Sequence, residues 1–244
     1  SVKIFDFCAL SDLHPSIQIR IKFFFIIISN YIFITKYKIN SYNMSTETKI
    51  LEEKISNSIK AWDKSLEEKS EKFSFNLNEK CIEELSNNKD KLSNQNPNDF
   101  SALNEFVHNL KENVLIGGCG FFVINGEKLS DFNINQKKDI NIIISKMIGQ
   151  LLEQNKNHDL HVEIKDLGKS MKTGGRYHHT KEGGSYHTDG SHLYKNPPDY
   201  VGLLCINPAK KGGVSKFMSA YTIHNKLLNH NNIKVIQHNH FKLF

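Results

Sequence analysis

The chain has 244 residues, of which 24% are charged and 39% are hydrophobic, a composition typical of a soluble globular protein with one sizeable core. Half of its net charge of +6 lies in residues 1–43, which hold five basic and two acidic residues, so no concentrated basic face indicates a nucleic-acid partner. The four cysteines form no CxxC pair, which argues against a zinc ribbon or a disulfide framework and favours a reducing, cytoplasmic location.

Residues 1–43 differ in character from the sequence that follows them. The chain starts with Ser1, its first methionine is Met44, and a charged helix start comes directly after that methionine. The apolar run Phe23–Ile34 is interrupted by polar residues and is too short to span a bilayer, and no usual cleavage site follows it. We therefore expect residues 1–43 to be a leader, either translated upstream sequence or a targeting segment, with a true structural element as the alternative and no membrane span in the mature protein.

Residues 44–110 are predicted to form a helical region. Apolar residues recur there at the spacing of a helix that buries one face, as they do again after residue 134. The Asn- and Lys-rich stretch 86–98 is predicted to be a loop, and Asp99 after it is a suitable N-cap for the next helix. The predicted helices span residues 47–70, 78–85, 99–110 and 135–152.

Residues 111–244 are predicted to form the second part of the molecule, in which short apolar runs alternate with turns. Gly117–Gly120 ends the preceding helix, and a final helix begins near Tyr221. Helices followed by short strands predict an α+β fold, with the helical N-terminal part packed on an incomplete double-stranded β-helix, or jelly roll. The predicted strands span residues 121–124, 160–164, 200–206 and 214–219.

A possible metal site lies in the segment Tyr186–His192. Its triplet His187-Thr188-Asp189 places an imidazole and a carboxylate on the same side of a strand, because side chains alternate with period two. These groups are two arms of the 2-His-1-carboxylate triad, which leaves open positions on Fe(II) for a co-substrate and oxygen. The triplet alone is weak evidence, since a surface turn can carry the same residues. A second pair, His161 and Glu163, is interpreted as an outward-facing strand pair.

The residues around this triplet carry a more specific signal. After it come an apolar run, a Pro208-Ala209 turn and the segment Gly212-Gly213-Val214-Ser215. Before it, Gly120–Gly126 reads as a G-F-x-x-x-x-G strand. This ordered series, over about residues 117–228, resembles the taurine dioxygenase-like (TauD/TfdA) family, whose members are Fe(II)- and 2-oxoglutarate-dependent dioxygenases.

The resemblance implies an oxidoreductase that uses Fe(II) as cofactor and 2-oxoglutarate as co-substrate to hydroxylate an unidentified small molecule. By the same resemblance, His187 and Asp189 are metal ligands and Ser215 contacts a carboxylate of 2-oxoglutarate. Tyr186 takes the position of a substrate-facing aromatic residue, with a core aromatic as the alternative.

The sequence departs from the family pattern after the triplet. The family has a second ligating His and a carboxylate-binding Arg far downstream, whereas no Arg follows Asp189 here and His230, His238 and His240 lie in a polar tail. We expect a fragment that lacks the third ligand and is inactive as written. The alternative is an inactive dioxygenase-fold remnant that acts as a binding or interaction module. A zinc hydrolase is disfavoured because no H-E-x-x-H spacing is present.

Overall fold

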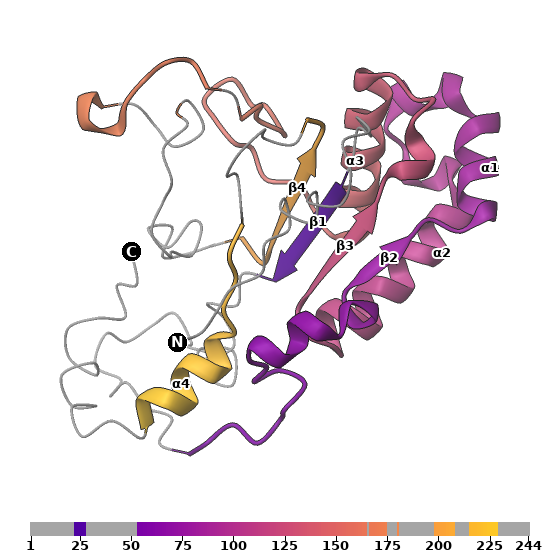
Figure 1. The fold of residues 1–244 in the computed structure, drawn as a ribbon. Helices are drawn as coiled ribbons and strands as arrows, with labels where there is room; N and C mark the ends of the chain where they lie inside the picture. Colours follow the sequence, from indigo (N-terminus) through magenta and orange to yellow (C-terminus); the bar gives the residue numbers. More distant parts are fainter. Residues whose placement is uncertain are drawn as a thin grey trace, which may run out of the picture.

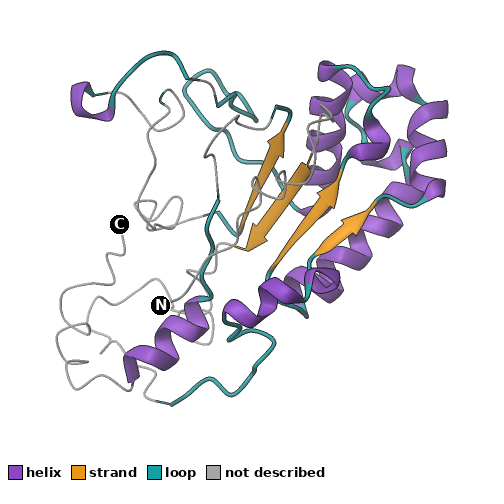
Figure 2. Cartoon of the chain, in the orientation of Figure 1, coloured by secondary structure: helices purple, strands orange, loops and turns teal. Residues whose placement is uncertain are grey.

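The computed structural model describes the backbone of Lys22–Ile27 and residues 53–164, 166–174, 180, 198–207 and 215–228. These residues form an α+β arrangement in which the helices α1, α2 and α3 gather on one side of a small sheet (Figure 1). The helix α4 lies apart from them (Figure 2). The α+β prediction is confirmed. The second sheet that a jelly roll requires is not found among the described residues, whose strands form one sheet.

The sheet has four strands in the order β2-β3-β1-β4. The strand β1 is antiparallel to both of its neighbours, and β2 is parallel to β3. Phe121, Phe122, Val123 and Ile124 are all buried, which is the apolar run expected of a strand covered on both faces. The strands are β1 (Lys22–Ile27), β2 (Ser74–Asn76), β3 (Phe121–Asn125) and β4 (Tyr200–Cys205).

The four α-helices lie close to their predicted positions. Asn78 caps the first one by accepting a hydrogen bond from the Cys81 N–H, and Asn133 and Gln136 form a reciprocal capping box at the start of the third. A π-helical turn, Lys111–Ile116, extends the second helix to Gly117. The helices are α1 (Glu79–Asn87), α2 (Ser101–Leu110), α3 (Ile134–Ile148) and α4 (Ala220–Leu228).

The N-terminus of α2 is capped from another helix. Asp99 was predicted as its N-cap, but the N-cap position is Phe100, which has no side-chain acceptor. The Glu84 carboxylate on α1 accepts hydrogen bonds from the Ala102 and Leu103 N–H groups, at 2.9 Å each. An anion at this position satisfies free donors and complements the helix dipole, so the contact also joins α1 to α2.

Shorter 3-10 turns replace several predicted features. The stretch 86–98, predicted as a loop, is largely taken up by the end of α1 and two such turns, and one more turn, η1, lies in the region 47–70 predicted as a long helix. These turns pack single apolar side chains, including Leu66 and Leu92, against the core formed by α1, α2, α3 and β3. The 3-10 turns are η1 (Lys64–Glu68), η2 (Ser70–Lys72), η3 (Lys89–Asn94), η4 (Pro97–Asp99), η6 (Glu127–Leu129) and η7 (Met171–Thr173).

Three predicted elements are wrong in the residues that the structure describes. Residues 53–63 are irregular, with a turn at 58–60, where a helix was predicted. Residues 160–164 form no strand, and Glu163 pairs with Lys138 on α3 instead. Residues 215–219 also form no strand. An alternating pattern gives a residue range a strand propensity but supplies no partner strand, and pairing is what stabilises a sheet.

A helix that crosses a bilayer must be long, at about 20 residues, and predominantly apolar. Within the described part of the chain, no helix meets both requirements.

Candidate functional site

The residues of the predicted metal triplet, His187 and Asp189, and the neighbouring Tyr186 lie outside the described residues. Within the described ranges, no three His, Cys, Asp or Glu side chains gather closely enough to hold a metal ion. The structure therefore describes segments that flank the triplet in the sequence. These are the loop that follows α3, which precedes the triplet, and the strand β4, which follows it.

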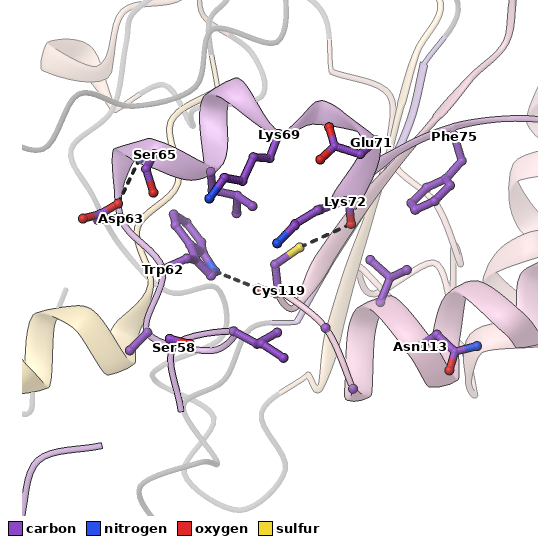
Figure 3. A pocket seen from close by; sticks show the side chains of 16 residues that line it. Ser58, Trp62, Asp63, Ser65, Lys69, Glu71, Lys72, Phe75, Asn113 and Cys119 are labelled. Atoms are coloured by element: carbon purple, nitrogen blue, oxygen red, sulfur yellow. Dashed lines mark hydrogen bonds between the residues drawn. The ribbon is translucent and has the colours of Figure 1, made fainter. Parts of the chain in front are cut away.

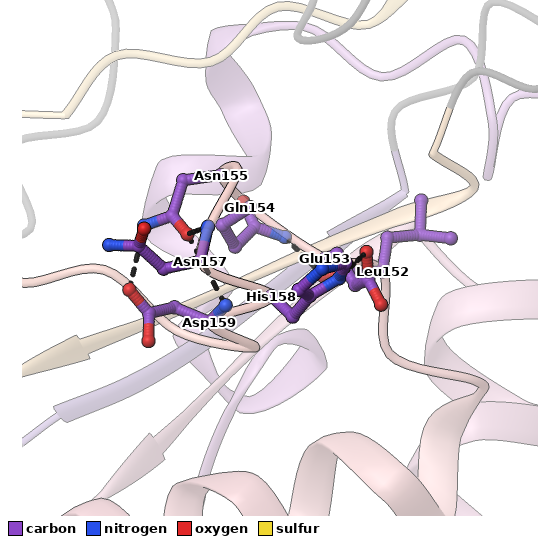
Figure 4. Close-up of polar contacts among 7 residues, drawn as sticks. All are labelled: Leu152, Glu153, Gln154, Asn155, Asn157, His158 and Asp159. Atoms are coloured by element: carbon purple, nitrogen blue, oxygen red, sulfur yellow. Dashed lines mark hydrogen bonds and ion pairs between the residues drawn. The ribbon is translucent and has the colours of Figure 1, made fainter.

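The loop after α3 is ordered by its own side chains (Figure 4). Asn155 accepts hydrogen bonds from the Asn157 and Asp159 N–H groups, at 2.9 and 3.3 Å, and its Nδ2 donates to Asp159 Oδ2 at 2.7 Å. The exposed His158 pairs with Glu153, with 2.6 Å between its Nδ1 and the carboxylate. These contacts close a tight polar turn, which explains the polar residues of this loop without a ligand.

Ser215, the predicted 2-oxoglutarate contact, is half-buried in the segment between β4 and α4. Two residues later, the Phe217 ring stacks on the Phe121 ring of β3, with 5.9 Å between centroids. Phe121 also contacts the rings of Trp62 and Phe73, at 5.6 and 5.2 Å. Aromatic pairs at these distances contribute beyond their buried area. The segment that carries Ser215 is thus fixed to the sheet.

The helix α4 and Ser219, directly before it, hold the irregular segment 53–62 through polar side chains, which we name the α4 clasp. Ser219 Oγ donates to the Lys60 carbonyl and Thr222 Oγ1 to the Trp62 carbonyl, both at 2.6 Å. Two further residues complete the clasp and contact residues earlier in the segment. They are His224, whose Nε2 lies 3.0 Å from the Glu53 carbonyl oxygen, and Asn225, which bonds the Ile55 backbone.

The clasp gives His224 a structural role. Because a carbonyl only accepts, its contact with His224 requires an N–H at Nε2. The hydrogen bonds of the clasp also explain why the helix predicted at residues 53–63 does not form. Side chains that bond backbone groups offer the chain an alternative to helical hydrogen bonds, and Asn57 adds to this by accepting from the Ile59 and Lys60 N–H groups.

A cavity of about 640 Å³ lies beside the clasped segment (Figure 3). Its lining comes from two parts of the chain, residues 58–75 and residues 113–119. The Trp62 indole Nε1 donates to the Cys119 carbonyl at 2.8 Å and so joins the two parts. A side chain on Gly118 would meet the Asn113 and Val114 carbonyl oxygens at 2.7 Å, which requires glycine where the loop passes the π-helical turn.

Two ionisable side chains, those of Lys60 and Cys119, form hydrogen bonds with the backbone of residues 115–121 beside the cavity. The Lys60 ammonium donates to the carbonyls of Leu115 and Ile116, at the end of the π-helical turn. Burial lowers the pKa of Lys60, and the nearby Cys119 opposes that effect. Burial also raises the pKa of the Cys119 thiol, whose Sγ donates to the Phe121 carbonyl at 3.3 Å. A buried, protonated thiol of this kind is inert at neutral pH.

No sequence motif predicts this cavity. The sequence places Trp62 within the predicted helix 47–70, and it assigns the glycine run to a helix end and the start of the next strand. The lining residues are brought together by tertiary contacts between distant segments, so spacing along the chain carries no signal of them.

Residues 114–233 match the sequence profile of a family of dioxygenases. That family is described as Taurine catabolism dioxygenase TauD, TfdA family, and this part of the chain is similar to it. The matched region contains β3, α3, the H-x-D triplet, β4 and α4. The resemblance on which the sequence analysis relied is confirmed.

A curated relative matches part of the same chain. It is FR-33289 synthase of Streptomyces rubellomurinus (strain ATCC 31215), 28% identical over 113 residues. The matched stretch covers 46% of this chain and 31% of that protein, so this chain spans about a third of its relative. No solved structure gave a significant match.

Proposed function

We propose that the chain is the H-x-D-bearing part of an Fe(II)- and 2-oxoglutarate-dependent dioxygenase that hydroxylates a small molecule. The observation that carries the proposal is that residues 114–233 match the dioxygenase family and contain His187-Thr188-Asp189. The name of the relative, a synthase, is compatible with small-molecule chemistry.

The donor set of the triplet fits ferrous iron. His187 offers an imidazole and Asp189 a carboxylate, which are two of the three ligands of a 2-His-1-carboxylate site. The third, a histidine, is not assigned to a residue. Bound iron and 2-oxoglutarate would together supply the activation of O₂ for hydroxylation, whereas the protein supplies binding, orientation and exclusion of water.

The remaining site residues have binding roles in this proposal. The Ser215 hydroxyl donates a hydrogen bond to a carboxylate of 2-oxoglutarate. Its segment is held to β3 by the Phe217–Phe121 stack, and such support is what keeps a binding group in place. Tyr186, directly before His187, faces the small-molecule substrate.

Metal binding by the 244-residue chain tests the ligand assignment. Fe(II) is titrated without oxygen in the presence of 2-oxoglutarate, and the visible charge-transfer absorption of the iron chelate is followed. We expect His187→Ala and Asp189→Ala each to weaken binding at least about tenfold, because each removes one of few ligands. His108→Ala, on the exposed face of α2, is the matched control. Equal affinities in all four proteins would refute the assignment.

The role of Ser215 has its own measurement. A hydrogen bond to a charged group contributes about 1.5–3 kcal/mol, so Ser215→Ala is expected to weaken 2-oxoglutarate binding roughly tenfold to a hundredfold. Ser86→Ala, on the exposed side of α1, is the control for loss of a hydroxyl. An unchanged 2-oxoglutarate affinity in Ser215→Ala, with iron binding intact, would show that this serine does not contact the co-substrate.

A further inference from the structure

We propose that the cavity beside Trp62 binds a small organic anion. Its charged end would lie between the ammonium groups of Lys69 and Lys72, and its apolar body against the Trp62 indole. The cavity volume of about 640 Å³ is in the range of small-molecule sites. The inference stands independently of the proposed iron site, because all lining residues precede residue 120.

The two lysines share one side of a tight turn. Lys69 precedes the 3-10 turn Ser70–Lys72 and Lys72 ends it, so the two positions are three residues apart. A 3-10 helix has three residues per turn, which makes positions i and i+3 eclipse one another. Both side chains extend toward Trp62 and Cys119 in Figure 3. The turn therefore presents two positive charges to the same space.

Neither charge is neutralised in the part of the chain that the structure describes. The ion pairs found there involve Lys128, Lys138 and His158. Of the two acids that line the cavity, Asp63 is engaged in capping the turn η1, where it accepts from the Ser65 N–H at 2.9 Å. That hydrogen bond lowers the pKa of Asp63 and keeps its carboxylate turned from the lysines.

The second acid lies on another side of the turn. Glu71 falls between the lysines in sequence, and a one-residue step on a 3-10 helix rotates a side chain by a third of a turn. Figure 3 shows its carboxylate above the turn, while the lysine nitrogens point below it. A bound anion could accept a charge-assisted hydrogen bond from each of these two ammonium groups.

The apolar wall of the cavity is fixed before any ligand binds. Trp62 is held by its hydrogen bond to Cys119 and by its edge-to-face contact with Phe121. Phe75 and Val114 add further apolar surface to the cavity lining. A wall that does not need to be ordered on binding lowers the entropic cost of association. An organic anion with a flat apolar body matches this wall better than an inorganic ion does.

Trp62 is the only tryptophan of the chain, so its fluorescence reports on this cavity alone. Benzoate is the anionic probe, and benzamide is its neutral counterpart of nearly the same shape. The metal-free chain is titrated with each, without 2-oxoglutarate, so the outcome does not depend on the iron site. We expect benzoate to change the Trp62 emission and to bind more weakly as salt is raised, because exposed charges are screened.

Single and double lysine variants test which charges bind the benzoate carboxylate. We expect Lys69→Gln and Lys72→Gln each to weaken benzoate binding about threefold to tenfold, and the double variant to weaken it further, because each variant removes one charge-assisted contact. Lys80→Gln, exposed on α1 away from the cavity lining, should bind as the unchanged protein does. Thermal melting of every variant confirms that the fold is retained.

A second readout needs no specific ligand. Iodide, an anionic quencher, should quench Trp62 more strongly in the unchanged chain than in the double lysine variant, while the neutral quencher acrylamide should act equally on both. Equal iodide quenching, equal benzoate affinity in all variants, or benzamide binding as tightly as benzoate would each overturn the proposal.

Discussion

Asn225 forms hydrogen bonds with both backbone polar groups of Ile55, its N–H and its carbonyl. Its Oδ1 accepts from the Ile55 N–H at 2.8 Å, and its Nδ2 donates to the Ile55 carbonyl at 2.9 Å. An amide side chain is matched to this task because it carries one acceptor and two donors in a plane. The pair joins residues 170 positions apart and anchors the start of the described segment 53–62 to α4.

Replacing Asn225 by Asp should loosen this connection. The substitution keeps the acceptor for the Ile55 N–H but sets a carboxylate oxygen against the Ile55 carbonyl, where no hydrogen is left to donate. Loss of a half-buried hydrogen bond with an unsatisfied partner costs about 1–3 kcal/mol in the free energy of unfolding. Denaturant unfolding of Asn225→Asp and of Asn104→Asp, an exposed control on α2, measures the difference. Similar stabilities in the two variants would show that the pair contributes little.

Removing the carboxylate that caps α2 should destabilise the helical part. Glu84→Ala leaves the Ala102 and Leu103 N–H groups without their acceptor, and loss of a cap costs about 0.5–2 kcal/mol. Glu84→Gln keeps one acceptor oxygen and should lose less. Chemical denaturation followed by circular dichroism compares these variants with Glu83→Ala, whose side chain is exposed on the same helix. A loss in Glu83→Ala as large as that in Glu84→Ala would contradict the capping role.

The buried thiol of Cys81 should make stability fall at alkaline pH. Burial, assisted by the nearby Glu84, raises the pKa of Cys81 from 9.0 to about 11. The folded chain therefore retains this proton where the unfolded chain loses it, so the contribution is complete below pH 9 and is lost as the pH rises toward 11.

The comparison with Cys81→Ala isolates this effect from other groups that titrate in the same range. The advantage of the unchanged protein over the variant should shrink by about 1–2 kcal/mol between pH 8 and pH 11, after allowance for solvent screening. Urea unfolding at both pH values gives the two differences. If the difference in stability stays constant with pH, the fold does not destabilise the thiolate form of Cys81.

A chain that starts at Met44 separates two accounts of the N-terminal residues. The sequence predicts a dispensable leader at 1–43, whereas β1 within it pairs with both β3 and β4. Without β1, the strand β4 loses its partner in the described sheet. We expect the shortened chain to melt at least about 4 °C lower, a shift that corresponds to roughly 1–2 kcal/mol. A chain starting at Arg20 keeps β1 and serves as the control. Equal melting of both shortened chains would support the leader.

The sequence predicted the elements whose residues carry their own signals. Apolar residues at helical spacing predicted helices at residues 78–85 and 135–152, and α1 and α3 occupy nearly these ranges. Phe121–Asn125 could be identified as a strand because four apolar residues in a row suit a strand covered on both faces. In each case the information lies within a few neighbouring residues.

The features that escaped prediction depend on residues far away in the chain. The cap of α2 is supplied by Glu84 rather than by the adjacent Asp99, and the segment at 53–63 is held by α4 instead of forming a helix. The predicted metal ligands came from a motif and a family resemblance, which require no tertiary information. The Trp62 cavity has no motif, since it exists only once the two segments that line it are packed together.

The α4 clasp also sets an order of events during synthesis and folding. The helices α1, α2 and α3 pack on partners that are close in sequence, as α1 does on α2 and α2 on α3. Contacts between distant residues form later because a long loop of chain must first be closed. When a ribosome has released the three helices, α4 has not yet been made, because the chain is synthesised from its N-terminal end. The clasp contacts of the segment 53–62 therefore form after the three helices have been made, although this segment is synthesised before any of them.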